Sequence, residues 1–325
     1  MRRIVWIDIA KAICIILVVI GHYIPETHPL WYWEMRNVIY TFHMPLFMFA
    51  SGYIYIATKK EISYSDFLWK KVKRLMIPYL TVSVLVVTIK LCTQGQAYVE
   101  NPVTPLSYFK ILYLPEAGYF LWFIWALWWM FILIPLFRNP QSRLGLFFVA
   151  ALLPLAAQYI PEEFCLKEFS MMLQYFVMGV VAYDWKHYLL RLKQIPLLYY
   201  CIAFSVIEML PYIGVEVFSL LTATMGIAFI LRGSYSLKDN VANHAWGRII
   251  MLISTASYII YLLHTTFEGF AKALILKLPY LSDLSNDIMF CVGAVFVIST
   301  GVIAPVLLYK YVLGRYKITK VLFGL

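Results

Sequence analysis

Charged residues are scarce in this sequence: they make up 14% of its 325 residues, whereas 62% are hydrophobic. An ordinary soluble domain is about one quarter charged, so this scarcity excludes that class of protein. The five cysteines stand singly, without a C-x-x-C pair or zinc-site spacing. The sequence also lacks the repeat period of about 20–50 residues that marks solenoids and propellers, and it has no low-complexity segment.

Long hydrophobic stretches fill the chain instead, and they are separated by short polar connections. About 20 apolar residues are needed for one helical crossing of a bilayer. The pattern predicts an all-α fold, a polytopic membrane bundle without a soluble domain, that forms one transmembrane domain over residues 1–325. We expect about ten transmembrane helices, at residues 4–22, 37–57, 75–91, 119–137, 144–157, 169–185, 195–210, 217–231, 249–267 and 288–312.

Lysine and arginine concentrate in alternate connections between these helices. The run from Lys59 to Arg74, Arg138 and Arg143 fall on one side, whereas acids such as Glu34 and Glu116 fall on the other. Basic connections are typical of the cytoplasmic side, which predicts that both termini are cytoplasmic. The net charge of +10 is then explained by contact with membrane lipids, and we expect no nucleic-acid partner. The oligomeric state stays open.

The first predicted helix carries three ionisable side chains, Asp8, Lys11 and His22. Such groups are costly inside a membrane and usually mark function or a pairing need. At 100° per residue all three fall within about 40° of one line, and Lys11 lies about 16 Å from His22 along the axis. We expect this stripe to face the protein interior. An ion pair between Asp8 and Lys11 near the inner surface, with a structural histidine, is the alternative interpretation.

Two further histidines are predicted at the depth of His22, in the outer half of the membrane. His43 lies at the start of the second predicted helix, and His264 lies at the end of the ninth. Imidazole exchanges protons near neutral pH, so a shared polar cavity is indicated. Metal binding is a rival use, but no H-x-x-H pair or neighbouring acidic ligand supports it, and we expect no metal.

A dense basic cluster precedes the third predicted helix, on the cytoplasmic side. Lysine and arginine suit phosphate recognition, and a nucleotide-bearing cofactor such as coenzyme A offers several phosphates. Anchoring to anionic lipid is the other use of such a cluster. Its members are Lys70, Lys71, Lys73 and Arg74.

These segments together resemble the acyltransferase family 3 of bacterial membrane proteins, the membrane O-acyltransferases of surface polysaccharides. Asp8, Lys11 and His22 are similar to the family's Arg/Lys-x10-His signature. The segment Phe42–Tyr53 (FHMPLFMFASGY) resembles a second family block. A third resemblance is the basic motif from Lys71 to Arg74, in which lysine replaces the first arginine.

The resemblance implies about ten helices in the bacterial cytoplasmic membrane and transfer of an acyl group, usually acetyl from cytoplasmic acetyl-CoA. The implied acceptor is a hydroxyl of a cell-surface or lipid-linked glycan. It also implies that His22 is catalytic, as general base or acyl relay, with Lys11 and its partner Asp8 supporting it. Lys71 and Arg74 would bind the donor's phosphates.

Other residues are candidates for binding the acceptor. His43 and His264 would orient His22 or bind the sugar, and Trp122 would stack on a sugar ring unless it belongs to the interfacial aromatic belt. Glu116, Glu34 and Glu268 are equivalent candidates for orienting a histidine.

A transporter or flippase of lipid-linked glycans is the alternative function. Transporters often show matching broken helices in two halves. In this sequence the functional-looking groups concentrate in the first three predicted helices and recur only in the ninth, which favours the enzyme.

Overall fold

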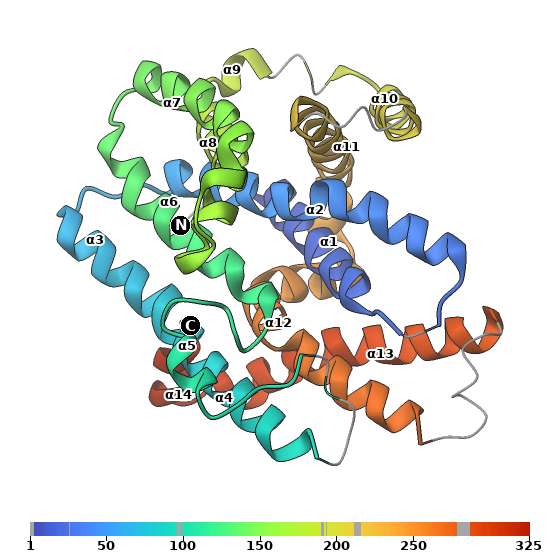
Figure 1. Cartoon of the computed structure of the whole chain (residues 1–325). Helices are drawn as coiled ribbons and strands as arrows, with labels where there is room; N and C mark the ends of the chain where they lie inside the picture. Colours follow the sequence, from blue (N-terminus) through green and yellow to red (C-terminus); the bar gives the residue numbers. More distant parts are fainter. Residues whose placement is uncertain are drawn as a thin grey trace. The chain divides into compact units, whose positions relative to one another are not determined.

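The computed structural model describes residues 3–25, 27–95, 99, 101–189, 192, 194–210, 216–277 and 287–325, and their regular structure is entirely helical (Figure 1). The elements, in chain order, are α1 (Val5–His22), α2 (Leu30–Ala57), α3 (Tyr64–Lys71), η1 (Val72–Met76), α4 (Ile77–Thr93), α5 (Ser107–Lys110), η2 (Tyr119–Leu121), α6 (Trp122–Leu133), η3 (Ile134–Leu136), α7 (Pro140–Leu152), η4 (Leu153–Tyr159), η5 (Glu163–Cys165), α8 (Leu166–Asp184), α9 (Lys186–Leu189), α10 (Leu197–Met209), α11 (Glu216–Asn243), α12 (Ala245–Ile275), α13 (Asp287–Leu308), η7 (Tyr309–Leu313) and α14 (Lys317–Leu322).

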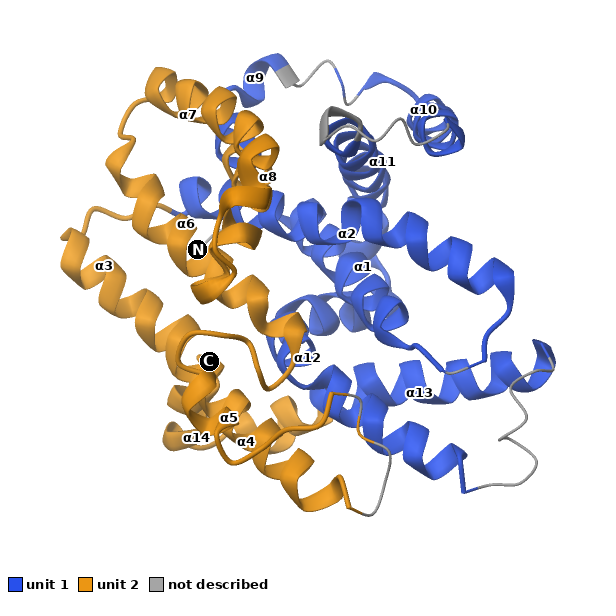
Figure 2. Ribbon diagram, in the orientation of Figure 1, with its two compact units in different colours: residues 1–58, 178–306 blue, residues 59–177, 307–325 orange. Residues whose placement is uncertain are grey.

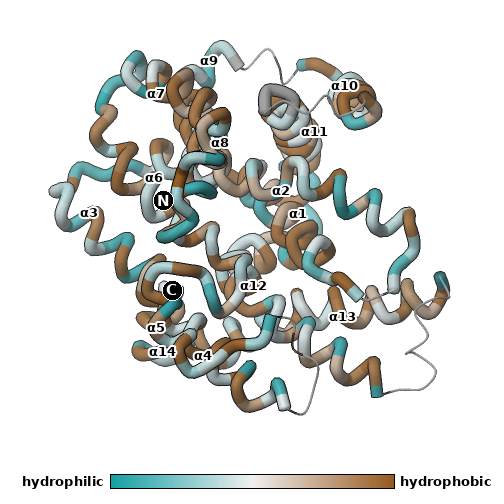
Figure 3. The backbone as a smooth tube through the Cα atoms, in the orientation of Figure 1, coloured by the Kyte–Doolittle hydropathy of each residue, from teal (hydrophilic) through white to brown (hydrophobic). Residues whose placement is uncertain are grey.

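Each of the ten predicted crossings coincides with a helical stretch. Within the described ranges, 8 stretches are long and apolar enough to span a membrane, and α2 and the shorter α10 account for the other two. Hydrophobic residues run along the long helices (Figure 3). The all-helical polytopic membrane bundle is therefore confirmed.

Two helices begin about two turns or more before the start that their hydrophobic pattern predicts. The helix α2 starts at Leu30, because the aromatic segment before residue 37 packs into the protein through Tyr32, which is only 3% exposed. The helix α3 starts at Tyr64, where Ser63 accepts a hydrogen bond from the backbone nitrogen of Asp66 at 3.1 Å. This side-chain cap offsets the polarity of the first turn. The basic cluster thus lies inside a helix and not in a connecting loop.

The chain folds as two compact units (Figure 2). Unit 1 comprises residues 1–58 and 178–306, and unit 2 comprises residues 59–177 and 307–325. In unit 1, α1 packs against α2, α11 and α12. Buried residues therefore occupy most of its circumference, among them Ile9, Cys14 and Val19. The helix that carries the ionisable stripe is thus central to its unit.

Contacts along α1 fix the relative directions of three helices. Ser254 of α12 bonds Asp8 near the start of α1, whereas Lys272 bonds the backbone just after the end of α1. The two helices are therefore parallel. The helix α2 is antiparallel to α1, because the Trp6 ring lies 5.2 Å from that of Tyr53 near the other end of α2. These directions agree with the predicted order of crossings.

Unit 2 is built around the continuous helix formed by α3, η1 and α4. Its middle turn, Val72–Met76, is π-helical. The helix α6 packs against α3 and η1, and α14 packs against α4. The Tyr79 hydroxyl donates to the carbonyl oxygens of Ile111 at 2.7 Å and Leu114 at 2.9 Å, which fastens the long connection after α4 to the helix.

A close helix approach in unit 1 yields a stability prediction. A Cβ atom added to Gly179 would overlap the backbone carbonyl oxygen of Phe49 in α2. Since backbone cannot move aside as a flexible side chain does, we expect Gly179→Ala to lower the free energy of unfolding by about 1–3 kcal/mol. Unfolding in mixed detergent–SDS micelles measures this loss.

Gly145→Ala is the matched control, because a Cβ there has nothing within 4 Å. Alanine in a helix interior is favoured over glycine by about 0.5–1 kcal/mol, so the control should be neutral or stabilised. Equal stabilities of the Gly179→Ala and wild-type proteins would contradict the close packing.

Candidate active site

His22 is the last residue of α1, where the helix leaves backbone carbonyls without helical partners. Side chains of α2 bind these carbonyls. The Tyr32 hydroxyl donates to Ile20 O at 2.7 Å, and Arg36 Nε donates to Gly21 O at 2.7 Å. The Tyr40 hydroxyl also donates to Gly21 O, at 3.2 Å. The peptide immediately before His22 is therefore held by two side chains from the same neighbouring helix.

The connection that follows α1 is fastened from α12. Lys272 Nζ donates to the carbonyl oxygen of Ile24 at 2.9 Å. Unsatisfied backbone groups in hydrocarbon cost several kcal/mol each, so these bonds lock the end of α1 to both α2 and α12. His22 is consequently positioned between those two helices.

The three predicted histidines gather at this end of α1. The ring centroids of His22 and His264 are 4.9 Å apart in an edge-on arrangement. The Tyr40 ring lies 4.7 Å from that of His43 and 6.5 Å from that of His22. His43 is 2% exposed and His264 is fully buried, whereas His22 is partly exposed. Of the three, His22 is the one that is not fully buried.

Backbone contacts assign the tautomers of the two buried histidines. His43 Nδ1 lies 2.8 Å from Ile39 O, and His264 Nδ1 lies 2.8 Å from Tyr261 O. Because a carbonyl oxygen only accepts, each neutral ring must carry its proton on Nδ1. Each Nε2 therefore offers a lone pair, and in His264 that atom belongs to the ring packed against His22.

One glutamate shares the helix face of His264. Glu268 follows it by one turn of α12 and is 3% exposed. Its side chain lies against Gly301 of α13, where an added Cβ would meet Glu268 Cγ at 2.9 Å. Of the three glutamates that the sequence left equivalent, Glu34 is exposed and Glu116 belongs to unit 2. Glu268 is the one placed beside a histidine.

Asp8 and Lys11 form a separate polar cluster near the start of α1. Asp8 accepts from Arg3 Nε at 2.9 Å and from Ser254 Oγ at 3.0 Å, and its carboxylate lies 3.7 Å from Lys11 Nζ. Lys11 Nζ also donates to Ser254 O at 3.5 Å. The stripe predicted from the helical period thus faces α12 at both levels, with an ion cluster at one and histidines at the other.

In unit 2 the basic cluster divides into two kinds of side chain. Lys70, Lys73 and Arg74 are exposed, whereas Lys71 turns inward. The Lys71 ammonium lies 3.4 Å from the centroid of the Phe131 ring of α6. The exposed members are available to a phosphate, and Lys71 serves the packing of α3 on α6.

Trp122 and Glu116, the remaining predicted contacts of the acceptor, also belong to unit 2. Trp122 begins α6 and is partly buried. Glu116 accepts from Ser107 Oγ and Lys110 Nζ, each at 3.2 Å, so it fastens its own loop. In the described part of the chain no three His, Cys, Asp or Glu side chains are placed to share a metal ion.

Arg36 and Tyr40 belong to the site although the sequence analysis did not select them. A usable signal was present. Arg36 is a basic residue on the predicted acidic outer side, and it stands seven positions, close to two helical turns, before His43. The bond from Lys272 to Ile24 carries no such signal, because the two residues are far apart in the chain.

Comparisons with known proteins support one family. A family model described as an acyltransferase domain matches residues 4–310. The chain is 32% identical over 149 residues to the nodulation protein NolL of Mesorhizobium japonicum, covering 44% of this chain and 38% of the relative. It is 33% identical over 172 residues to NolL of Sinorhizobium fredii, covering 49% and 45%. The chain thus spans less than half the length of these curated relatives. No solved structure matches.

The inward position of Lys71 predicts that its role is partly structural. Lys71→Ala removes a cation–π contact and a packed side-chain stem, and we expect unfolding free energy to fall by about 1–2 kcal/mol. Lys70→Ala, which alters an exposed neighbour, should stay within about 0.5 kcal/mol of wild type. Thermal unfolding of the purified proteins compares them. If both variants match wild type, the contact with Phe131 contributes no stability.

Proposed function

Since the chain belongs to the acyltransferase family 3 of multi-pass membrane proteins, we propose that it transfers acetyl from cytoplasmic acetyl-CoA to a hydroxyl of a cell-surface or lipid-linked glycan. The proposed location is the bacterial cytoplasmic membrane. The observation that supports this best is the imidazole of His22, which is held at the end of α1 with its ring centroid 4.9 Å from that of His264.

In the proposed reaction His22 acts as general base. Its unprotonated ring nitrogen takes the proton of the acceptor hydroxyl as the oxygen attacks the thioester carbonyl. The carbon–sulfur bond then breaks, and the leaving coenzyme A sulfur takes the proton from His22, which regenerates the base. The product is an oxygen ester on the sugar.

His264 is proposed as a positioning residue. Its Nε2 can accept a hydrogen bond from a ring N–H of His22. This bond would fix the orientation of the His22 ring and stabilise the imidazolium that forms. His43 packs against Tyr40, which also binds the carbonyl before His22. In this proposal His43 stabilises the wall of the site, and Trp122 and Glu116 stay candidate contacts of the acceptor.

The basic groups are assigned to the donor. Lys11 lies about 16 Å along the axis from His22, and Asp8 holds it in place. In the proposal Lys11 supports the donor on the way to the imidazole. Lys70, Lys73 and Arg74 bind its phosphates by their exposed charges, with Lys71 as a helix-packing member of the same cluster.

Family membership favours the enzyme over a transporter or flippase of lipid-linked glycans.

Replacing His22 tests the proposal directly. We expect His22→Ala to lower acetyl transfer by about 10²–10⁴-fold, the usual contribution of general base catalysis. His187→Ala, which changes an exposed histidine of α9, should retain full activity. The measurement is transfer of radiolabelled acetyl from acetyl-CoA to membrane glycan, with both variants matched for expression and thermal stability. Near-normal activity of His22→Ala would remove this residue from the mechanism.

The general-base route and an acyl-histidine relay differ in one intermediate. Only the relay forms an acetyl-imidazole on the protein. We expect the general-base route, so wild-type protein incubated with labelled acetyl-CoA and no acceptor should carry no label after rapid quenching. Label on His22 that is lost when acceptor is added would establish the relay instead.

A further inference from the structure

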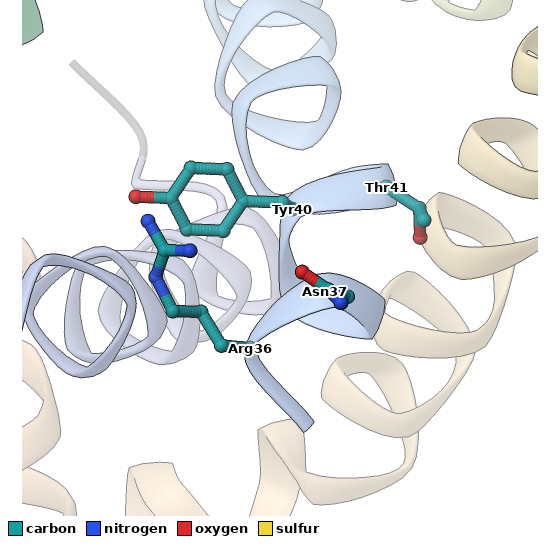
Figure 4. Close-up of a pocket in the computed structure, with 4 residues that line it drawn as sticks. All are labelled: Arg36, Asn37, Tyr40 and Thr41. Carbon is teal, nitrogen blue, oxygen red and sulfur yellow. The ribbon is translucent and has the colours of Figure 1, made fainter. Parts of the chain in front are cut away.

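A pocket beside His22 is not used by the proposed transfer. It has a volume of about 440 Å³ and is lined by Arg36, Asn37, Tyr40 and Thr41, four residues of α2 (Figure 4). Arg36 and Tyr40 both bind the carbonyl of Gly21, so the pocket adjoins the peptide that precedes His22. A group bound there contacts Tyr40, whose ring centroid lies 6.5 Å from that of His22.

Arg36 is held rigidly in this pocket. Its guanidinium carbon lies 4.4 Å from the Tyr40 ring centroid and 5.1 Å from that of Trp33. Nε is committed to Gly21 O at 2.7 Å. Two aromatic contacts and one hydrogen bond fix the plane of the guanidinium, and Figure 4 shows its terminal nitrogens turned toward the hydroxyl end of Tyr40. The side chain loses little entropy when it binds a ligand.

Among the residues that the structure describes, the terminal nitrogens of Arg36 have no acidic partner. None of the ion pairs between described residues includes Arg36. Its hydrogen bond to a described residue is the one that Nε donates to Gly21 O. An arginine fork with both ends available matches the two oxygens of a carboxylate or phosphate. A charge this close to an apolar bilayer needs such a counter-ion.

We propose that Arg36 binds an anionic group of the acceptor, so that the favoured acceptor is an acidic glycan or a sugar phosphate and not a neutral sugar. This inference rests on the proposed acyl transfer, because it specifies the acceptor of that reaction. The oxyanion on Arg36 anchors the acceptor, and a hydroxyl of the same or the neighbouring sugar residue reaches His22.

The other end of the pocket supports this orientation. Thr41 Oγ1 donates to Glu208 Oε1 at 2.7 Å, which places a carboxylate beyond Thr41. Like charges repel, so the anion of the acceptor is directed to Arg36 and its neutral hydroxyls are directed to Asn37 and Thr41. The pocket therefore has a positive end, which is the end nearest His22.

A lipid headgroup phosphate offers the same oxyanion chemistry. Arg36 would then anchor the protein to the membrane and would not bind the acceptor. The two sources are separable, because soluble acceptors and membrane lipids can be varied independently.

The test compares acceptors that differ in charge. Protein in phosphatidylcholine nanodiscs receives labelled acetyl-CoA and methyl glucoside, methyl glucuronide or glucose 6-phosphate. We expect wild type to favour the anionic acceptors by about tenfold in kcat/KM, which equals about 1.4 kcal/mol. Arg36→Gln should abolish the preference, and Arg36→Lys should retain part of it, because lysine keeps the charge without the fork.

Arg36 also donates a hydrogen bond to the carbonyl at the end of α1, and Tyr40→Phe is the matched control for this capping role. It removes the other donor to Gly21 O but leaves the guanidinium, so activity falls while the charge preference persists. If Arg36→Gln lowers the rates for neutral and anionic acceptors equally, Arg36 only caps α1 and the proposal is overturned.

Binding without chemistry separates this proposal from acyl transfer itself. In the absence of acetyl-CoA, methyl glucuronide or inorganic phosphate should raise the thermal stability of wild type but not of Arg36→Gln. Stabilisation without any transfer would leave the anion site standing and reject the enzyme. If neither anion raises the thermal stability of wild type, the proposed anion site is overturned. Stabilisation only by phosphatidylglycerol in the nanodisc assigns Arg36 to lipid, which overturns it as well.

Discussion

The carbonyl oxygens at the end of α1 impose the constraint on which unit 1 depends. In a bilayer, water is not available to hydrogen-bond them, so protein side chains must do so. Tyr32, Arg36 and Tyr40 supply donors from α2, and Lys272 supplies one from α12. Meeting this need brings both helices to the same end of α1. The grouping of His22 with His264, and of Arg36 beside them, follows from that convergence.

The same helix carries two polar levels with different characters. At its start, Asp8 is neutralised by Arg3 and Lys11, so the charges there are mutually satisfied and stabilise the contact with α12. At its end, histidine rings take the place of ion pairs, and backbone carbonyls contact Nδ1 of His43 and of His264. One stripe of ionisable residues therefore forms an ion cluster at one level and a group of imidazole rings at the other.

The number of helices, their order and the inward face of α1 could be predicted because each depends on local periodicity. The grouping of His22 with His264 at one end of α1 could also be predicted, since it depends on where each histidine falls along its helix. The start of α2 was misjudged because Tyr32 belongs to an aromatic run that is typical of interfaces, yet it is buried. Arg36 was not selected, and Glu268 was not distinguished from Glu34 and Glu116, since the importance of both residues comes from neighbours on other helices that no single segment reveals. The division of the basic cluster depended on Phe131, which lies far along the chain.

The π-helical turn at Val72–Met76 has a consequence for how this protein can vary. A π turn accommodates one residue more than an α turn, and such turns frequently mark functional sites. Removing a residue there would restore a regular α-helix and rotate everything beyond it by about 100°. Tyr79 would then lose its hold on the loop after α4. We therefore expect related sequences to differ in this turn by substitutions and not by insertions or deletions.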